Sequence, residues 1–550
     1  MMKRNLVKMF EETIRKNWDL PAFSNYKGET YKYSDVADKI VFLHHLFRNM
    51  GIKRGDKISV IGINSTNWAI VYLSVVTYGA VIVPILPDFK PADIHHIVNH
   101  SDSVLFFAAD TIFENLDETS MPNLPAIFSL TDLSVLHSNK KNLNIIIEKT
   151  EKSYLEKYDG KLTAEKLEFD EVNNSELVSI IYTSGTTGFS KGVMLLHNNL
   201  AANIVFAQEH MPLQPGETIV SFLPVAHVFG CVFEFLFPVT CGCHITFLGK
   251  IPSPKVLIKA FDEIHPRLIL SVPLVIEKIY KKQVKPTLEK GSMKILLKIP
   301  FMRKVIYKKV NAKLTEVFGG NFREIVIGGA ALNEEVEQFL RNIGFRYTVG
   351  YGMTECAPLI SYTSCKDFKK ASTGQIVDTM EVKIDSKDPY NEVGEILVRG
   401  ENVMCGYYKY EDASKEALDT DGWLHTGDLG VIDKENFIFI KGRCKSMILG
   451  PSGKNIYPEE IEAKLNNMPF VMESIIIEKD GKLIALVYPD MEAVDTNKVS
   501  ERELVNIMTD NRKQLNLHLP GYMNITRIEI YPEEFEKTPK KSIKRFLYAT

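Results

Sequence analysis

YTSGTTGFSKGV, residues 182–193, follows the apolar run LVSIIY at 177–182 and precedes a helix-like segment at 200–208. The apolar run predicts a buried strand, so the sequence places a glycine-rich loop between a strand and a helix. In such a loop the glycines let backbone N–H groups face an anion, and the hydroxyls and Lys191 add donors and positive charge. The loop indicates a polyphosphate site, although it lacks the GxxxxGK[ST] order of the Walker A loop. An ordinary glycine-rich turn is the alternative that the loop alone leaves open.

Short apolar runs alternate with helix-like segments through the first half of the chain. Strand-like runs lie at 57–63, 81–85 and 104–108, and a helix-like segment lies at 68–77. Because strands that alternate with covering helices build parallel sheets, this half predicts an α/β architecture. The same pattern continues at 268–270, 325–327, 334–342 and 347–349.

The pattern changes after Gly374. Short alternating runs, separated by glycine and aspartate turns, predict a small antiparallel, barrel-like subdomain. From about residue 443 a fresh unit begins, with helix-like and strand-like segments of its own. We therefore expect an α/β protein with a large N-terminal domain, residues 1–442, built from two α/β subdomains and the barrel-like one. A smaller, mobile C-terminal α/β domain is expected at 443–550.

Length and composition bound the class of protein. A chain of 550 residues is long enough for three or four compact units, and its 45% hydrophobic and 25% charged residues are typical of a globular protein. The formal net charge of −3 gives no general attraction to nucleic acid. Seven scattered cysteines do not form a disulfide pattern, which favours a reducing cytoplasm. No signal peptide is expected, since the charged N-terminal segment lacks an apolar core.

The longest apolar stretch, residues 220–248, is interrupted by prolines, histidines and Glu234. A membrane-spanning helix needs about 20 nearly uninterrupted apolar residues. We therefore interpret this stretch as a buried strand, loop and helix that line an apolar pocket.

Six further motifs follow the glycine-rich loop in a fixed order. They are LPVAH at 223–227, GGA at 328–330, YGMTE at 351–355, GWLHTGD at 422–428, GRCK at 442–445 and GKNIYPEEIE at 453–462. Together with YTSGTTGFSKGV they resemble the adenylate-forming superfamily, which includes acyl-CoA synthetases, luciferases and nonribosomal-peptide adenylation domains. SGKNIYPEEIE and the later IKRFLY most resemble bacterial long-chain fatty acid–CoA ligases.

The resemblance implies a two-step reaction with ATP, Mg²⁺ and coenzyme A. A fatty acid carboxylate attacks the α-phosphorus of ATP to give acyl-AMP and pyrophosphate, and the acyl group then passes to coenzyme A with release of AMP. Because the first step brings two anions together, the site must supply cations and oriented donors. The C-terminal domain is expected to swing about Lys445 between the steps, so that the Gly453 region faces the adenylate.

The resemblance also implies roles for the motif residues. Lys191 and Thr354 contact phosphate, and Glu355 holds Mg²⁺. The Tyr351 ring lies on adenine, and Asp428 and Arg443 bind the ribose. The remaining nucleotide- and cofactor-binding residues are Thr183, Ser184, Gly185, Thr186, Thr187, Gly188, Gly328, Gly329, Ala330, Gly352, Lys445 and Gly453. His227 gates a fatty-acid tunnel, whose wall is expected to include Val228, Phe229, Gly230 and Val232.

One position departs from the family pattern. The adenylation lysine of the family lies in T-P-x-x-K, where this chain has Ser542 in TPKKSIKR, residues 538–545. A neighbouring lysine, Lys541 first and Lys540 or Lys544 next, is predicted to take over, because a four-carbon stem spans several ångströms. Substitution by another cation, or slow adenylation, are the alternatives.

Residues 278–313 are rich in lysine and arginine, with Glu289 as the only acid and apolar residues interleaved. Such a basic, amphipathic segment predicts peripheral contact with the inner face of a membrane that delivers fatty acid. A solvated helical face is the alternative. Nucleic-acid binding is a weaker interpretation of this segment, because no recognition motif accompanies the charge.

The partners expected are therefore a fatty acid, ATP and coenzyme A, with no nucleic acid and with a homodimer left open. Two rivals remain to the coenzyme A ligase. One is a ligase that loads an acyl-carrier protein or stops at acyl-adenylate. The other, motivated by Ser542, is a degenerate protein that binds an acyl-adenylate or lipid without catalysis.

Overall fold

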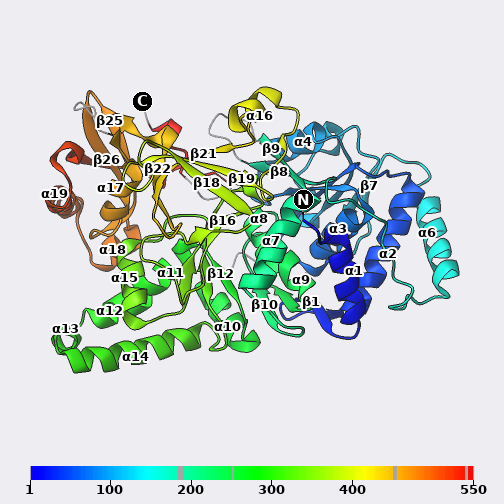
Figure 1. Cartoon of the computed structure of the whole chain (residues 1–550), viewed down its shortest axis with the longest axis horizontal. Coiled ribbons are helices and arrows are strands. Elements are labelled where there is room, and N and C mark those ends of the chain that lie inside the picture. Colours follow the sequence, from blue (N-terminus) through cyan, green and yellow to red (C-terminus); the bar gives the residue numbers. More distant parts are fainter. Residues whose placement is uncertain (1, 184–190, 250–252, 450–454, 539–542, 549–550) are drawn as a thin grey trace.

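A computed structural model describes residues 2–183, 191–249, 253–449, 455–538 and 543–548 (Figure 1). The N-terminal part lies at one end of an elongated molecule, at the right of Figure 1, and the C-terminal part lies at the other end. The strands and helices between them meet in the middle (Figure 1).

An eight-stranded sheet forms the centre of the N-terminal part, in the order β20-β9-β8-β4-β3-β5-β6-β7. Its strands are β3 (Lys57–Ile61), β4 (Val81–Ile85), β5 (Ser103–Ala108), β6 (Ala126–Ser129), β7 (Val135–Ser138), β8 (Leu177–Thr183), β9 (Lys191–Leu196) and β20 (Gly406–Tyr407). Five adjacent strands, β8, β4, β3, β5 and β6, are parallel, as the alternating pattern predicts. Strands β7, β9 and β20 extend the sheet antiparallel at its edges.

Helices accompany this sheet, and one of them corresponds to the helix-like segment predicted at 68–77. They are α1 (Leu6–Lys16), α2 (Tyr33–Met50), α3 (Thr66–Tyr78), α4 (Pro91–His100), α5 (Asp110–Phe113) and α6 (Leu143–Tyr158). Helix α3 begins where the Ser65 side chain accepts a hydrogen bond from the Trp68 N–H, and it ends at Gly79 in the left-handed conformation. Its residues are almost all buried, which fixes α3 between the sheet and its neighbours.

Two smaller sheets build the second subdomain, in the orders β10-β11-β1-β2 and β12-β13-β14. Their strands are β1 (Pro21–Asn25), β2 (Thr30–Lys32), β10 (Thr218–Ser221), β11 (His244–Phe247), β12 (Ile269–Ser271), β13 (Ile325–Ile327) and β14 (Tyr347–Val349). Because β12, β13 and β14 run parallel, the loops that follow β13 and β14 leave the sheet at the same edge. The GGA motif follows β13 directly, and the YGMTE motif begins two residues after the end of β14.

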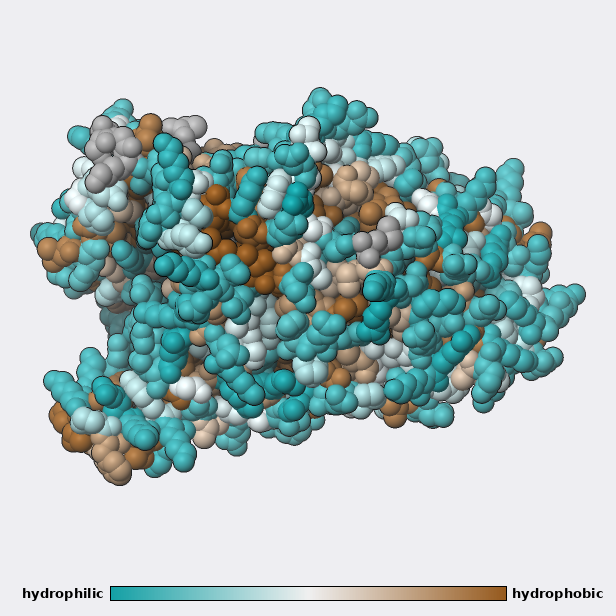
Figure 2. Space-filling view, viewed as in Figure 1, coloured by the Kyte–Doolittle hydropathy of each residue, from teal (hydrophilic) through white to brown (hydrophobic). Residues whose placement is uncertain are grey.

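The helices of this subdomain pack around two hydrophobic cores. They are α7 (His197–His210), α8 (Val228–Gly230), α9 (Phe237–Thr240), α10 (Pro254–Ile264), α11 (Pro273–Ile279), α12 (Lys285–Leu288), α13 (Gly291–Lys298), α14 (Pro300–Val317) and α15 (Glu334–Ile343). Helices α13 and α14 form a hairpin at the lower-left end of the molecule (Figure 1). Figure 2 shows apolar side chains gathered at this end, and a second apolar patch left of the centre of the same face.

The third subdomain is antiparallel, as predicted, but it is not a closed barrel. Its strands are β15 (Tyr351–Gly352), β16 (Leu359–Tyr362), β17 (Gln375–Ile376), β18 (Met380–Asp385), β19 (Gly394–Gly400), β21 (Leu424–Ile432) and β22 (Ile438–Arg443), with α16 (Glu411–Ala417). They form two open sheets, β15-β16-β17 and β18-β19-β21-β22. Within the described ranges an isolated bridge between Gln375 and Phe437 and the backbone hydrogen bonds beside it join the two sheets, and they do not close into a barrel.

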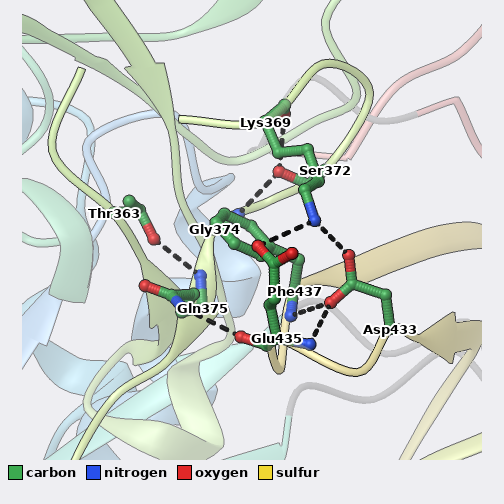
Figure 3. A network of polar contacts seen from close by, with 8 residues as sticks. All are labelled: Thr363, Lys369, Ser372, Gly374, Gln375, Asp433, Glu435 and Phe437. Atoms are coloured by element: carbon green, nitrogen blue, oxygen red, sulfur yellow. Dashed lines mark hydrogen bonds and ion pairs between the residues drawn. The ribbon is translucent and has the colours of Figure 1, made fainter. Parts of the chain in front are cut away.

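Figure 3 shows the polar contacts that hold this junction. Lys369 Nζ lies 2.6 Å from a carboxylate oxygen of Asp433 and 3.1 Å from one of Glu435. The Gln375 side-chain amide donates to the Glu435 carbonyl at 2.9 Å. A Cβ at Gly374 would lie 2.5 Å from the carbonyl carbon of Tyr362, so only glycine fits at this crossing.

The C-terminal part has its own sheet, β25-β26-β27, and its own core. Its elements are β23 (Ile448–Leu449), β24 (Asn455–Ile456), α17 (Pro458–Leu465), β25 (Val471–Lys479), β26 (Lys482–Pro489), α18 (Met491–Thr496), α19 (Glu501–Leu517) and β27 (Ile525–Ile530). It touches the second subdomain through Lys282 Nζ, 2.7 Å from a carboxylate oxygen of Glu492, and through Lys281, which donates to the Asn466 carbonyl. The boundary at residues 442/443 and the mobility of this part stay predictions.

Helices able to cross a bilayer were sought among the described residues. None of those helices is both long enough and apolar enough to do so.

Candidate active site

Tyr407 connects the predicted phosphate-binding lysine to the predicted metal-binding acid. The Tyr407 hydroxyl donates to a carboxylate oxygen of Glu355 at 3.1 Å, and Lys191 Nζ lies 5.0 Å from the centre of the Tyr407 ring. Burial, followed by the nearby Glu355 charge, raises the pKa of Tyr407. The phenol therefore stays protonated and keeps its donor role at neutral pH.

Strand pairing brings these three residues together from distant parts of the chain. Lys191 opens β9, and β20 pairs with β9 so that Tyr407 lies opposite Val193. The Met404 N–H donates to the Glu355 carbonyl at 2.8 Å, which holds the YGMTE loop against this edge. The predicted phosphate contact Thr354 is buried beside Glu355.

Gly352 lets the YGMTE loop fold back on itself. A Cβ at this position would lie 2.2 Å from the Pro358 carbonyl oxygen, so no larger residue fits without movement of the backbone. The fold of this segment therefore requires glycine at position 352, and the nucleotide-binding role of Gly352 stays a prediction.

Asp428 lies between Tyr351 and Arg443. The Tyr351 hydroxyl donates to one carboxylate oxygen at 2.7 Å, and Arg443 Nε lies 3.0 Å from the other. Asp428 and Arg443 face each other across the β21–β22 ladder, which sets this geometry. Asp428 is only 6% exposed.

The electrostatics of Asp428 reflect opposing effects. Burial raises the pKa of its carboxyl, while Arg443 and the Tyr351 hydroxyl lower it. For Tyr351, burial and the Asp428 charge raise the pKa of the phenol. Each carboxylate oxygen accepts more than one hydrogen bond, so Asp428 keeps acceptor capacity for a pair of hydroxyls.

Tyr351 and Glu355 lie on one short segment, which brings the two groups of residues together, and Cys356 follows it directly. Burial raises the pKa of its thiol most, and the charges of Glu355 and Asp428 raise it further. Lys191, Glu355, Asp428 and Arg443 are thus brought to one region, as their motifs predict.

The GGA loop touches the predicted acyl-binding segment. The Gly328 N–H donates to the Ser271 carbonyl at 3.0 Å, and a Cβ on Gly328 would lie 3.1 Å from the ring of Phe229. Gly329 has φ +87°, a conformation that favours glycine, and Ala330 is exposed. The loop expected near adenine and the segment expected near the acyl chain therefore share a contact.

His227 caps the first helix of the apolar segment. Its Nδ1 accepts from the Phe229 N–H at 3.3 Å, and the ring is half-buried. After α8, residues Cys231–Leu236 form a π-helix, a form that is rare and frequent at functional sites. Val228, Gly230 and Val232 are buried and Phe229 is half-buried, which agrees with the predicted strand, loop and helix.

Two buried polar residues that sequence reasoning missed hold the loop leading to His227. One carboxylate oxygen of Glu234 accepts from the N–H groups of Phe222 and Leu223, both at 2.9 Å. The Asn64 side chain accepts from the Val225 N–H at 3.0 Å and donates to the Leu223 carbonyl at 2.7 Å.

Glu234 is unusual in its surroundings. Burial raises the pKa of its carboxyl well above the usual range, and its second oxygen has no hydrogen-bond partner among the described residues. The signal in the sequence was that Glu234 is the only acid in residues 220–248, with no lysine or arginine beside it. Tyr407 gave no comparable signal, because it lies outside the motifs.

Several predicted residues lie outside the described ranges. They are Ser184, Gly185, Thr186, Thr187, Gly188, Gly453, Lys540 and Lys541. The two residues that flank the glycine-rich loop pair across β8 and β9, where the Thr183 hydroxyl donates to the Lys191 carbonyl at 3.4 Å. Lys445 is exposed just after Arg443, and Lys544 Nζ lies 2.6 Å from a carboxylate oxygen of Glu536.

Comparison with known proteins adds a family and relatives. Residues 10–408 match the model of the AMP-binding enzyme family. The long-chain-fatty-acid–CoA ligase FadD15 of Mycobacterium bovis is 28% identical, over 91% of this chain and 87% of its own length. A long-chain-fatty-acid–CoA ligase of Escherichia coli is also 28% identical, over 86% of this chain and 82% of its own.

Solved structures share the fold. ATP-bound MatB from Rhodopseudomonas palustris superposes with a TM-score of 0.77 at 19% identity, covering 99% of this chain and 98% of that one. The anthranilate CoA ligase AuaEII in complex with anthranoyl-AMP gives a TM-score of 0.79 at 18% identity, covering 99% and 96%. At this identity the likeness concerns the fold alone.

Proposed function

Because the chain belongs to the AMP-binding enzyme family, we propose that it is an ATP-dependent ligase for long-chain fatty acids and coenzyme A. It forms acyl-AMP from the fatty acid, releases pyrophosphate, and passes the acyl group to coenzyme A with release of AMP. The observation that carries the proposal is the Lys191–Tyr407–Glu355 group beside the Tyr351–Asp428–Arg443 group. The names of the curated relatives support the choice of substrate.

In the first step, Lys191 neutralises charge where the carboxylate meets the α-phosphate. Tyr407 lies under the Lys191 ammonium and limits its positions. Glu355 would hold Mg²⁺, a cation that prefers oxygen ligands and would offset the phosphate charge. Among the described residues the Tyr407 hydroxyl is hydrogen-bonded to one Glu355 oxygen, and the second oxygen is proposed to bind the cation.

The ribose is expected to bind at Asp428. The carboxylate accepts hydrogen bonds from the two hydroxyls, while the Tyr351 hydroxyl holds its position from below. Arg443, whose side chain is 69% exposed, is free to turn from Asp428 to the ribose. Gly328, Gly329 and Ala330 are expected to border the adenine.

The fatty acid tail is expected along the apolar segment that begins at His227. Val228, Phe229 and Val232 offer an apolar wall, and each buried methylene contributes about 0.8 kcal/mol. Glu234 and Asn64 hold the loop that carries His227, so that the start of the wall has a fixed position relative to the nucleotide.

The second step needs access for a thiol. We infer that the C-terminal part turns about Lys445 and brings the Gly453 region to the adenylate. The contacts of Lys281 and Lys282 with the C-terminal part are mostly exposed, and exposed ion pairs contribute little, so these two contacts oppose such a turn only weakly. Lys541 is proposed to stand in for the family lysine during the first step.

The enzyme is proposed to act in the cytoplasm, peripherally at the inner face of the membrane. All seven cysteines are free, which supports a reducing compartment. The homodimer stays an open prediction, which sedimentation velocity would test.

Release of AMP tests the proposal and separates its rivals. Fatty acids of graded length are supplied with ATP and Mg²⁺, and with coenzyme A, an acyl-carrier protein or neither. AMP release that depends on both a long-chain fatty acid and coenzyme A supports the ligase. Release with the carrier protein instead, or accumulation of acyl-AMP alone, favours the first rival. No fatty-acid-dependent AMP under any condition overturns the proposal in favour of a non-catalytic binding protein.

A further inference from the structure

The hairpin of α13 and α14 presents apolar side chains to solvent. Ile295, Ile299 and Phe301 are 66%, 47% and 74% exposed. Ile299 alone joins the two helices, so these three residues lie at and beside the turn, which we call the hairpin tip. In Figure 2 apolar side chains gather at this end of the molecule. Large apolar residues grouped on a protruding tip are a feature of interaction sites.

The hairpin tip is surrounded by positive charge. Residues 290–313 contain eight lysines and arginines and no acid. They are Lys290, Lys294, Lys298, Arg303, Lys304, Lys308, Lys309 and Lys313, all exposed. None of them forms an ion pair within the part of the chain that the structure describes. The full positive charge is therefore available to a partner.

The rest of the molecule has the opposite charge. The chain carries a formal net charge of −3, so removing the +8 of residues 290–313 leaves −11 elsewhere. An anionic surface would attract the hairpin and repel the remainder, which orients the molecule as well as binding it.

The base of the hairpin is fixed to the body. Leu314 of α14 is buried, and the Asn311 side chain donates to the carbonyls of Ile343 and Gly344 at 2.9 and 2.8 Å. Lys285, before α13, lies 2.9 Å from a carboxylate oxygen of Glu335. The tip therefore protrudes from a rigid support.

These anchoring contacts leave only part of the predicted basic segment, residues 278–313, available to a membrane. Lys281, Lys282 and Lys285 are engaged with Asn466, Glu492 and Glu335, so the start of residues 278–313 serves contacts within the protein. Only the later part, from Lys290 onward, combines unpaired charge with exposed apolar residues.

We propose that the hairpin tip inserts into an anionic phospholipid bilayer, with the surrounding lysines on the headgroups. Isoleucine and phenylalanine partition into the acyl boundary of a bilayer, and lysines add electrostatic attraction to anionic lipid. A nucleic acid would use the charge but not the exposed isoleucines and phenylalanine. This proposal identifies the surface that makes the membrane contact proposed above. Vesicle binding needs neither ATP nor fatty acid, so its test is independent of the ligase activity.

Vesicle co-sedimentation tests the proposal. The full chain is mixed with phosphatidylcholine vesicles or with vesicles that also contain phosphatidylglycerol, at low and high salt. We expect binding to the anionic vesicles at low salt and weaker binding at high salt. The triple variant Lys294→Glu, Lys298→Glu and Lys304→Glu should lower partitioning at least tenfold, since each cation near the surface contributes about fivefold. Ile295→Ser, Ile299→Ser and Phe301→Ser together should lower it by a similar factor.

Helix α6 supplies a matched control. It is a surface helix with Ile145 and Leu155 exposed at 65% and 54%, but its lysines alternate with glutamates. Figure 1 places α6 at the opposite end of the molecule from α13. Ile145→Ser with Leu155→Ser should leave vesicle binding unchanged.

Insertion has a direct readout in Phe301→Trp. Its fluorescence should shift to shorter wavelength on anionic vesicles and be quenched by brominated acyl chains, beyond the response of the unsubstituted protein. Absence of binding to anionic vesicles at low salt would overturn the proposal. So would binding that the tip and charge variants leave intact, or that the α6 variant abolishes. A hairpin that binds duplex nucleic acid but not vesicles would also refute it.

Discussion

The Tyr351 hydroxyl lies 2.7 Å from a carboxylate oxygen of Asp428, within the buried centre of the site. Together with Arg443, this hydrogen bond offsets the cost of burying the Asp428 carboxylate. It joins the residue expected to stack on adenine to the residue expected to bind ribose, so one connected unit is expected to recognise both parts of a nucleoside.

Tyr351→Phe should therefore move the pH dependence of ATP use. The hydroxyl stabilises the ionised form of Asp428, so its loss raises the pKa of that carboxyl further. A hydrogen bond to a charged group is worth about 1.5–3 kcal/mol, which corresponds to about one to two pH units. The acidic limb of kcat/KM for ATP should shift upward by that amount. An unchanged pH profile with a uniformly lower rate would indicate a structural role instead.

Two variants should separate the contribution of the Tyr407 hydroxyl from that of the Tyr407 ring. Tyr407→Phe keeps the ring under Lys191 but removes the bond to Glu355, so we expect a several-fold higher requirement for Mg²⁺ and little change at saturating Mg²⁺. Tyr407→Ala also removes the cation–π contact and should raise KM for ATP by a further two- to fivefold. Pyrophosphate exchange over a range of Mg²⁺ concentrations measures both.

Tyr408→Phe is the matched control for these variants. Its hydroxyl donates to Asp102, away from Lys191 and Glu355. If Tyr408→Phe changed the Mg²⁺ requirement as much as Tyr407→Phe, the assigned role of Tyr407 would be wrong.

Glu234 should tolerate glutamine but not alanine. Glu234→Ala leaves the buried N–H groups of Phe222 and Leu223 without an acceptor, at a cost of about 1–3 kcal/mol each. Glu234→Gln keeps an acceptor oxygen and similar volume. The urea midpoint of unfolding and the rate of acyl-dependent AMP release should both fall sharply for Glu234→Ala and little for Glu234→Gln.

The same acid predicts a pH effect of definite sign. Its folded-state pKa is raised by burial, so above about pH 4.3 the unfolded chain loses a proton that the folded chain keeps. The folded state then binds more protons, and the contribution of Glu234 to stability falls as pH rises towards the folded pKa. Glu234→Gln has no such titrating group. Its free energy of unfolding should therefore rise relative to that of the unsubstituted protein by up to about 1.4 kcal/mol per pH unit. Urea midpoints at pH 5, 6 and 7 give the comparison, and parallel curves would count against a protonated Glu234.

Lys445→Pro should distinguish the two half-reactions. Proline fixes φ at the proposed hinge, and Lys445 is exposed, so the fold should be retained. We expect normal pyrophosphate exchange and at least tenfold slower thioester formation. Equal loss in both assays would argue against rotation at this residue.

Alanine substitution of Lys540, Lys541 and Lys544 in turn tests the replacement of the family lysine at Ser542. Lys541→Ala is expected to lower acyl-dependent pyrophosphate exchange most, by tenfold or more. Lys544 pairs with Glu536, so Lys544→Ala should have a smaller effect. If none of the three variants lost activity, a different cation must serve the first step.

Much of the fold follows from local pattern. The strands at Lys57–Ile61 and Val81–Ile85 and the helix at Thr66–Tyr78 were predicted to within about two residues, because apolar periodicity and capping act over short distances. Whether the antiparallel subdomain closes could not be predicted from the sequence, since closure depends on whether strand edges far apart along the chain meet.

The site shows the same division. Motif residues such as Glu355 and Asp428 were predicted because their sequence context is distinctive. Tyr407 was missed because its position depends on a two-residue strand that pairs with β9 from about 200 residues away. Asn64 was missed for a similar reason, since its partners are the backbone groups of Leu223 and Val225, which carry no side-chain signature.

Gly328 and Phe229 meet where the nucleotide and the lipid are expected to meet. A protein engineer who trims Phe229 to admit bulkier tails would also remove the support behind Gly328. Variants selected for a new tail length should therefore often change their KM for ATP, even when no residue around the purine has been altered.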